Sequence, residues 1–321
     1  MSLKIYLRKD IKSIMTSMNR SNQQIIQPIP LKIGDKIGLI STARKISDEE
    51  LSIAIKEIEG WGFETVLAKS IYSSHHQFAG TNSERTDAFQ ELLNDPEIKA
   101  IICARGGYGT VKIIDKLSFD KFIQNPKWIA GYSDVTVLHS HLNQLNIASL
   151  HSTMPINFKG NTKETLQALK DSLLGKAIRY KLTTNPLNRN GIGKGQIVGG
   201  NLSILYSLLG SRSDINTDGK ILFIEDLDEY LYHIDRMMTA LDRSGKLSKL
   251  NGLIVGGMTQ MHDNETPFGK NALEIILESV EKYDFPVCFD FPAGHISNNL
   301  PIKLGCQVEL NVNHFVSLTY E

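Results

Sequence analysis

From residue 36 onward, short runs rich in aliphatic and β-branched residues alternate with segments whose apolar residues recur at helical spacing. Residues 36–42 form the first such run, residues 48–61 the first helical pattern, and residues 98–104 a nearly continuous apolar run of the kind found in strands covered on both faces. This alternation predicts parallel sheets joined by right-handed crossovers. Ligands in such sheets bind beyond the carboxyl ends of the strands, so candidate functional residues are expected there.

The other expected elements continue the alternation to the C-terminus. In the first half we expect strands over 64–68, 128–131 and 148–151, and helices over 83–93, 110–117, 135–145 and 162–174. In the second half we expect strands over 196–198, 220–224, 252–255 and 286–290, and helices over 202–209, 230–241 and 270–282. Residues 307–310 and 315–319 flank an Asn-rich turn and predict a terminal β-hairpin.

The length of 321 residues predicts about two domains at about 100–200 residues each. Residues 183–195 concentrate Asn, Gly, Pro and Thr, which is typical of a linker. We therefore expect an N-terminal α/β domain over 28–160, a linker region over 161–195 and a smaller C-terminal α/β domain over 196–321. Residues 1–27 have no apolar core of a secretory signal and are interpreted as a non-catalytic tail, a misplaced start before Met18, or an organellar presequence.

The charge balance excludes several classes of protein. The chain has 35 basic and 35 acidic residues, but residues 1–27 hold five basic residues and one acidic residue, so the remaining 294 hold 30 and 34. A mildly acidic body argues against nucleic acid as a partner, and no apolar run approaches the ~18–20 residues of a membrane span. Three cysteines without a C-x-x-C pair indicate buried side chains in a reducing compartment.

A glycine-rich segment, Arg105-Gly-Gly-Tyr-Gly-Thr110, follows an expected strand. It is not a dinucleotide-binding fingerprint, because Lys112 occupies the place of the last glycine, and the chain has no P-loop. It also has no H-E-x-x-H motif, so the sequence predicts neither a metal nor a cofactor. The loop fits two roles equally: a tight strand-to-helix turn, or a source of unhindered backbone N–H groups.

Ser133 falls where an expected strand ends and an amphipathic helix begins. A sharp turn there would lift its hydroxyl above the sheet, and the helix N-terminus would stabilise developing negative charge, as a nucleophile requires. Gly131 gives room, although the second glycine of G-x-S-x-G is missing. Serine is also among the commonest N-cap residues, so a simple capping role stays open.

A serine nucleophile needs a base and a group that orients the base. Glu225 follows the apolar run 220–224, and His295 follows another expected strand through a Pro-Ala-Gly turn. Both lie at strand ends. Glu225 also fits a helix-favouring acidic cluster, and His295 an ordinary surface loop, and spacing alone does not show that the three residues meet.

Six segments together resemble the LD-carboxypeptidase family, the serine peptidases that include muramoyltetrapeptide carboxypeptidase and the microcin C self-immunity proteins. The likeness extends from about Pro30 to the C-terminus. The segments are residues 31–38 with 41–43, 103–109, 131–134, 199–203, 223–226 and 291–295.

The resemblance implies a Ser-Glu-His triad at Ser133, Glu225 and His295, with oxyanion donors at the backbone N–H groups of Gly107 and Asp134. It also implies a flavodoxin-like parallel sheet in the N-terminal domain, a triad shared between the two domains, a homodimer and a cytoplasmic setting. The expected reaction is acyl transfer without a cofactor, removing the terminal D-alanine from murein tetrapeptides.

The expected murein substrate is anionic, so an enzyme with a net negative charge must concentrate positive or amide groups around its binding site. Arg105, Tyr108 and Asn201 are the candidate substrate-binding residues, although Arg105 equally fits a structural partner of a carboxylate. Two alternatives stay open. One is an amidase that cleaves aminoacyl-nucleotide compounds, as in the microcin immunity branch, and the other is a non-catalytic protein that binds a small polar ligand.

Overall fold

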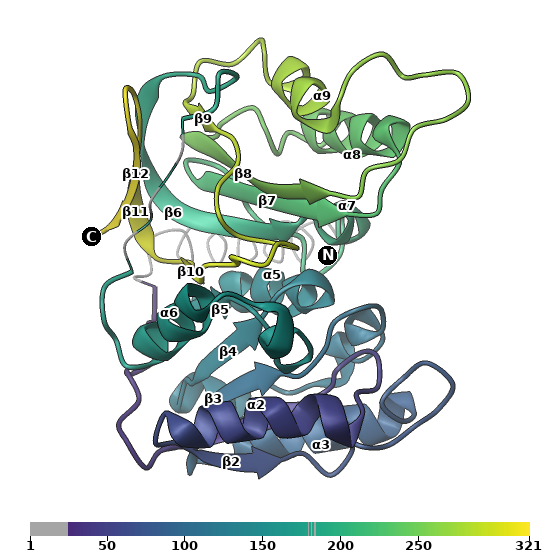
Figure 1. The fold of residues 1–321 in the computed structure, drawn as a ribbon, viewed down its shortest axis with the longest axis vertical. Helices are drawn as coiled ribbons and strands as arrows, with labels where there is room; N and C mark the ends of the chain where they lie inside the picture. The colour runs from purple at the N-terminus through teal and green to yellow at the C-terminus, as the bar shows by residue number, and fades with distance from the viewer. Residues whose placement is uncertain (1–24, 179, 181, 183) are drawn as a thin grey trace, which may run out of the picture.

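The protein contains two six-stranded sheets, one above the other along the long axis of the molecule (Figure 1). The structure is a computed structural model that describes residues 25–321 apart from residues 179, 181 and 183. Most of the predicted tail, residues 1–24, therefore lies outside the described residues. Ile26, at the end of that segment, forms a parallel bridge with Ile147 beside the first sheet.

The first sheet has five parallel strands in the order β2-β1-β3-β4-β5. This is the flavodoxin-like strand order, so the expected fold of the N-terminal half is confirmed. The strands are β1 (Lys36–Ile40), β2 (Glu64–Leu67), β3 (Ile98–Cys103), β4 (Trp128–Gly131) and β5 (Ser149–His151).

Helices cover both faces of this sheet. Alternate strand residues point to opposite faces, so Leu39 packs with α2 (Asp48–Gly60) and α6 (Lys163–Leu173), whereas Ile40 packs with α3 (Asn82–Asn94) and α5 (Thr136–Gln144). Capping boxes start α2 and α3, because Ser47 and Thr81 each exchange hydrogen bonds with the glutamate three residues later. Shorter helical segments are α4 (Asp120–Gln124) and the 3₁₀ turns Thr110–Lys112, Ile114–Lys116, Ser133–Val135 and Pro155–Gly160.

The second sheet combines four parallel strands with the predicted hairpin, which is confirmed. The strands β6 (Gly191–Asn201), β7 (Ile221–Leu227), β8 (Gly252–Thr259) and β9 (Val287–Cys288) are parallel, and β11 (Gln307–Val312) pairs antiparallel with β6 and with β12 (Val316–Tyr320). One face is covered by α7 (Leu202–Ser207), α8 (Leu231–Arg243) and α9 (Ala272–Ser279).

One strand from the C-terminal half of the chain belongs to the first sheet. β10 (Ile302–Leu304), which the sequence analysis missed, pairs antiparallel with β5 and so completes the first sheet. Figure 1 shows this late segment lying between the two sheets, with α5 beside it. Its three residues are too few to display a pattern, and only the open edge of β5 explains their conformation.

The sequence-based linker 183–195 differs from the structure, because Gly191–Gly195 are the first half of β6. Glycine is needed there for close approach rather than for flexibility. A Cβ on Gly193 would lie 2.0 Å from the Asn251 carbonyl oxygen, and one on Gly195 would lie 2.5 Å from that of Gly219. This strand is rich in glycine because it packs against neighbouring backbone, and its composition therefore resembles that of a loop.

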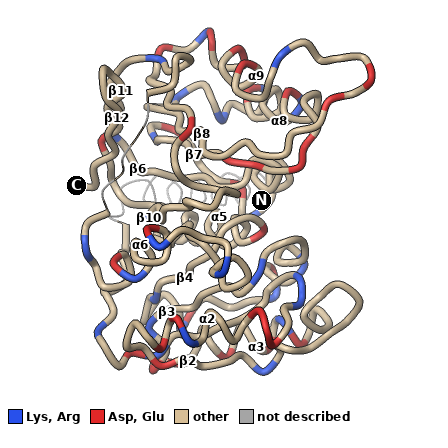
Figure 2. The backbone as a smooth tube through the Cα atoms, in the orientation of Figure 1, with Lys and Arg blue, Asp and Glu red and all other residues tan. Residues whose placement is uncertain are grey.

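Lysine and arginine are interspersed with aspartate and glutamate over both halves, and an acidic run leads out of β7 (Figure 2). Among the described residues, no helix has the length and apolar character needed to cross a bilayer.

Candidate active site

Ser133 lies in a strained turn directly after β4. Its φ is 63°, in the left-handed region that costs a non-glycine residue of order 1–3 kcal/mol. The turn is the sharp strand-to-helix junction expected of a nucleophile. The capping alternative finds no support, because neither the Ser133–Val135 turn nor α5 has a side-chain cap.

The glycine-rich loop lies against the Ser133 hydroxyl. A Cβ on Gly106 would meet Ser133 Oγ at 3.2 Å, tighter than ordinary van der Waals contact, so the glycine lets the loop backbone lie close to this hydroxyl. The amide of Gly107 forms no hydrogen bond within the described part of the chain. A free N–H beside the nucleophile is what an oxyanion hole requires.

A buried arginine and a buried aspartate support this loop from below. Arg85 is fully buried, donates to the Gly109 carbonyl at 3.0 Å and also donates to the Thr42 carbonyl. The Asp134 side chain accepts the Thr110 N–H at 2.8 Å. Burial lowers the pKa of Arg85 and raises the pKa of Asp134. The charge of each residue opposes the shift that burial causes in the other. Sequence analysis missed Arg85, because an arginine on a helix gives no sign that it is buried.

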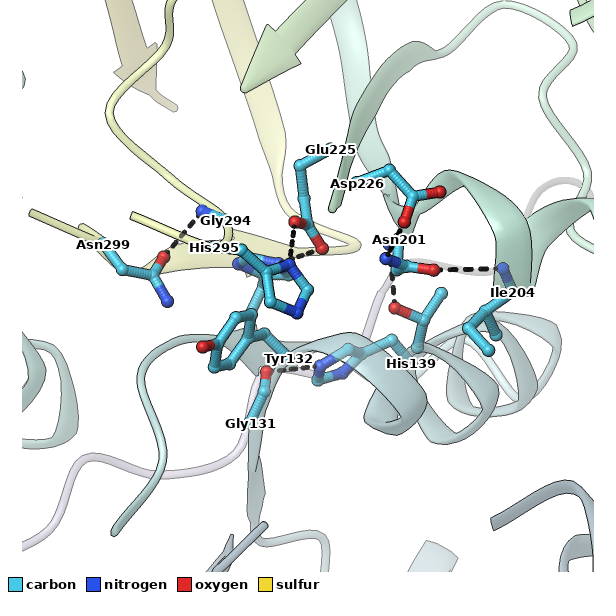
Figure 3. A network of polar contacts seen from close by, with 12 residues as sticks. Gly131, Tyr132, His139, Asn201, Ile204, Glu225, Asp226, Gly294, His295 and Asn299 are labelled. Carbon is cyan, nitrogen blue, oxygen red and sulfur yellow. Dashed lines mark hydrogen bonds and ion pairs between the residues drawn. The ribbon is translucent and has the colours of Figure 1, made fainter. Parts of the chain in front are cut away.

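Glu225 and His295 form a close pair between a strand and a loop. Glu225 lies near the end of β7, and its Oε2 accepts the His295 Nδ1–H at 2.6 Å (Figure 3). Burial alone would raise the pKa of Glu225, but the neighbouring histidines outweigh it and hold that pKa at about 2. Burial would lower the pKa of His295, but the Glu225 carboxylate outweighs burial and raises that pKa above its usual value.

The surrounding residues fix this pair in place. Gly294 donates its N–H to Asn299 Oδ1 at 2.9 Å, and a Cβ on Gly294 would lie 2.7 Å from Glu225 Oε2. The Tyr132 ring lies against the His295 imidazole, with centroids 4.6 Å apart (Figure 3). The residue beside Ser133 therefore contacts the histidine, although no hydrogen bond joins Ser133 to His295 among the described residues.

Asn201 is fully engaged in holding the end of β6. Its Nδ2 donates to Asp226 at 2.8 Å, its Oδ1 accepts the Ile204 N–H at the start of α7, and only 3% of the residue is exposed (Figure 3). Burial and the charge of Glu225 raise the pKa of Asp226 to about 7. These contacts hold the Asn201 amide in place near Glu225, and its part in substrate binding stays a prediction.

Arg105 and Tyr108 lie on the loop itself. The Arg105 guanidinium donates to the Lys45 carbonyl at 3.0 Å, and Tyr108 is exposed beside the Phe78 ring. Arg105 is half-buried, and the part of both residues in substrate binding stays a prediction.

The family models match both halves of the chain. The LD-carboxypeptidase N-terminal domain matches residues 37–152, and the LD-carboxypeptidase C-terminal domain matches residues 194–310. The chain belongs to the LD-carboxypeptidase family. The resemblance seen in the sequence is confirmed, and the protein is a serine-type carboxypeptidase of this family.

Individual relatives cover nearly the whole chain. A probable murein peptide carboxypeptidase of Bacillus subtilis is 33% identical over 295 residues, which span 89% of this chain and 91% of that protein. The microcin C7 self-immunity protein MccF of Escherichia coli is 27% identical over 330 residues, spanning 90% and 94%. The solved structure of muramoyltetrapeptide carboxypeptidase from Oxalobacter formigenes has the same fold, with a TM-score of 0.80 at 24% identity over 89% of this chain and 98% of that one.

We predict that Arg85→Met lowers the free energy of unfolding by about 3 kcal/mol, because it leaves the buried Thr42 and Gly109 carbonyls without their donor and removes a positive charge near the buried Asp134. Lys69→Met is the matched control, since Lys69 pairs with Glu91 at 2.6 Å on the surface and should contribute less than about 1 kcal/mol. Urea denaturation measures both values. Equal losses in the two variants would contradict a supporting role for Arg85.

We also predict the pH dependence of reaction at Ser133. A base must be neutral, so the rate falls as pH drops through the pKa of His295, which the Glu225 carboxylate raises above the usual value for histidine. Glu225→Gln removes the anion that raises this pKa, so the acid limb should move to lower pH while the plateau rate falls by about 10⁴. The measurement is the rate of labelling by a fluorophosphonate as a function of pH.

Glu229→Gln is the control for that profile, because Glu229 belongs to the same acidic run but pairs with His233. This variant should keep the acid limb of the pH profile at the wild-type pH. An unshifted limb in Glu225→Gln would show that Glu225 does not set the pKa of the base.

Proposed function

We propose that the protein removes the terminal D-alanine from murein tetrapeptides through a Ser133 acyl-enzyme, in peptidoglycan recycling. The observation that carries the proposal is the strained Ser133 turn, under a glycine loop and beside a buried Glu225–His295 pair. The names of relatives from Bacillus subtilis and Pseudomonas aeruginosa support the substrate class.

In the proposed mechanism His295 acts first as base and then as acid. Its Nδ1–H is held by Glu225, which leaves Nε2 free to take the Ser133 proton as Oγ attacks the peptide carbonyl. The N–H groups of Gly107 and Asp134 then stabilise the oxyanion. His295 gives its proton to the leaving amine of D-alanine, and water, activated by the same imidazole, releases the acyl group from Ser133.

The setting of this activity is also a proposal. The domains 28–160 and 196–321 would supply the serine and the Glu–His pair respectively. We propose that Arg105 and Tyr108 contact the substrate at the mouth of the loop, and that the enzyme works in the cytoplasm as a homodimer. Arg105 is the cationic residue that immediately precedes the Gly106–Gly109 loop.

A second candidate is cleavage of aminoacyl-nucleotide amides. It is favoured by the likeness to the microcin C7 self-immunity protein, whose structure with aspartyl sulfamoyl adenosine has a TM-score of 0.83 over 92% of this chain and 98% of that one, at 22% identity. Incubation of the purified protein with a muramoyl tetrapeptide and, separately, with an aminoacyl sulfamoyl adenosine distinguishes the two by the masses of the products.

We predict that Ser133→Ala lowers D-alanine release from the tetrapeptide by about 10⁶, because the nucleophile is lost. Ser140→Ala is the matched control, since Ser140 is buried on α5 and its hydroxyl has no partner among the described residues. It should keep full activity. Release at the wild-type rate by Ser133→Ala would refute the mechanism, and absence of fluorophosphonate labelling in the wild type would favour a non-catalytic binding protein.

A further inference from the structure

His151 lies behind the Glu225 carboxylate, on the side opposite to the pair with His295. It is the last residue of β5 and therefore belongs to the first sheet, whereas Glu225 belongs to the second. Both side chains are completely buried. The sequence analysis saw His151 only as the end of a short strand.

Three polar atoms at this contact have no hydrogen-bond partner among the described residues. They are both ring nitrogens of His151 and the Oε1 atom of Glu225. Nε2 and Oε1 face one another at 3.9 Å, about 1 Å beyond a hydrogen bond. Buried polar groups are almost always satisfied, so a donor and an acceptor left unpaired at this distance point to each other as partners.

The other neighbours of His151 do not compete for it. His139, whose ring centroid is 6.3 Å away, uses one nitrogen with Ser149 Oγ and the other with the Gly131 carbonyl. The Tyr132 hydroxyl bonds Asn157, and the Phe223 ring packs edge-on against the imidazole. His295 lies beyond the carboxylate, on its Oε2 side. Glu225 is thus the charged group that His151 faces.

We infer that His151 is a positioning residue of the reaction, which donates its Nε2–H to Glu225 Oε1 and thereby holds Oε2 toward His295. This inference rests on the proposed triad. A side-chain shift of about 1 Å forms the bond, and an error of that size in a catalytic group costs about 10² in rate. His151 also joins the serine-bearing sheet to the sheet that carries the acid–base pair.

A donor on Oε1 has an effect that simple packing lacks. It withdraws negative charge from the carboxylate, so the Glu225–His295 pair holds its shared proton less tightly. Removing the donor raises the pKa at which the Glu225–His295 pair takes up a proton. The acid limb of the pH profile then moves to higher pH. This shift is opposite in sign to that expected for Glu225→Gln.

The test is fluorophosphonate labelling of His151→Phe and His151→Gln as a function of pH. His151→Phe keeps the ring volume without the donor, so we expect plateau labelling about 10²-fold slower and an acid limb about one pH unit higher. His151→Gln restores an N–H donor and should recover about tenfold of the rate. His141→Phe is the control, because His141 packs on Phe119 and bonds Ser213, away from Glu225.

The outcomes separate this inference from the proposed function. No labelling of the wild type refutes the triad itself. If the wild type is labelled and a folded His151→Phe protein has the same labelling rate and pH profile, only the role of His151 is overturned. Should His151→Phe fail to fold, the ¹⁵N spectrum of histidines in the wild type decides, since a proton on His151 Nε2 is expected and a proton on Nδ1 alone would refute the bond.

Discussion

The site depends on keeping one carboxylate charged inside the protein. Moving an ion such as Glu225 out of water costs several kcal/mol after relaxation, and only close partners offset that cost. Its partners come from elsewhere in the fold: His295 from the loop after β9, and His151 from the end of β5 in the first sheet. Burial of this group therefore requires the two halves of the chain to be packed together, and the same packing brings His295 against Tyr132, the residue before Ser133.

The sequence was most informative where a local pattern and the chemistry coincide. Alternating strands and helices predicted the parallel sheets, and Ser133 lies just after β4 of the first sheet while Glu225 lies near the end of β7 in the second. The pairing of Glu225 with His295 joins positions 70 residues apart, and periodicity carries no information on such a contact. That pairing was expected only from the likeness to a family.

Other features could not be predicted from the sequence, because the same residue types occur in two different structural settings. The glycines of residues 191–195 indicate a loop by frequency, but they lie in β6, where neighbouring backbone leaves no space for a side chain. Arg85 on α3 has the appearance of a surface charge, yet it is buried under the loop beside Ser133. His151 ends a three-residue strand, and its facing carboxylate appears only in three dimensions.

The return of β10 to the edge of β5 has a consequence for synthesis of the protein. Residues 36–151 leave the ribosome first, and their sheet waits about 150 residues for the strand that closes it. At ~5–20 residues per second this interval is roughly 8–30 s, during which β5 has unpaired backbone groups. The nascent first sheet thus exposes the edge that ends in His151, and the chain protects it only when its last segment emerges.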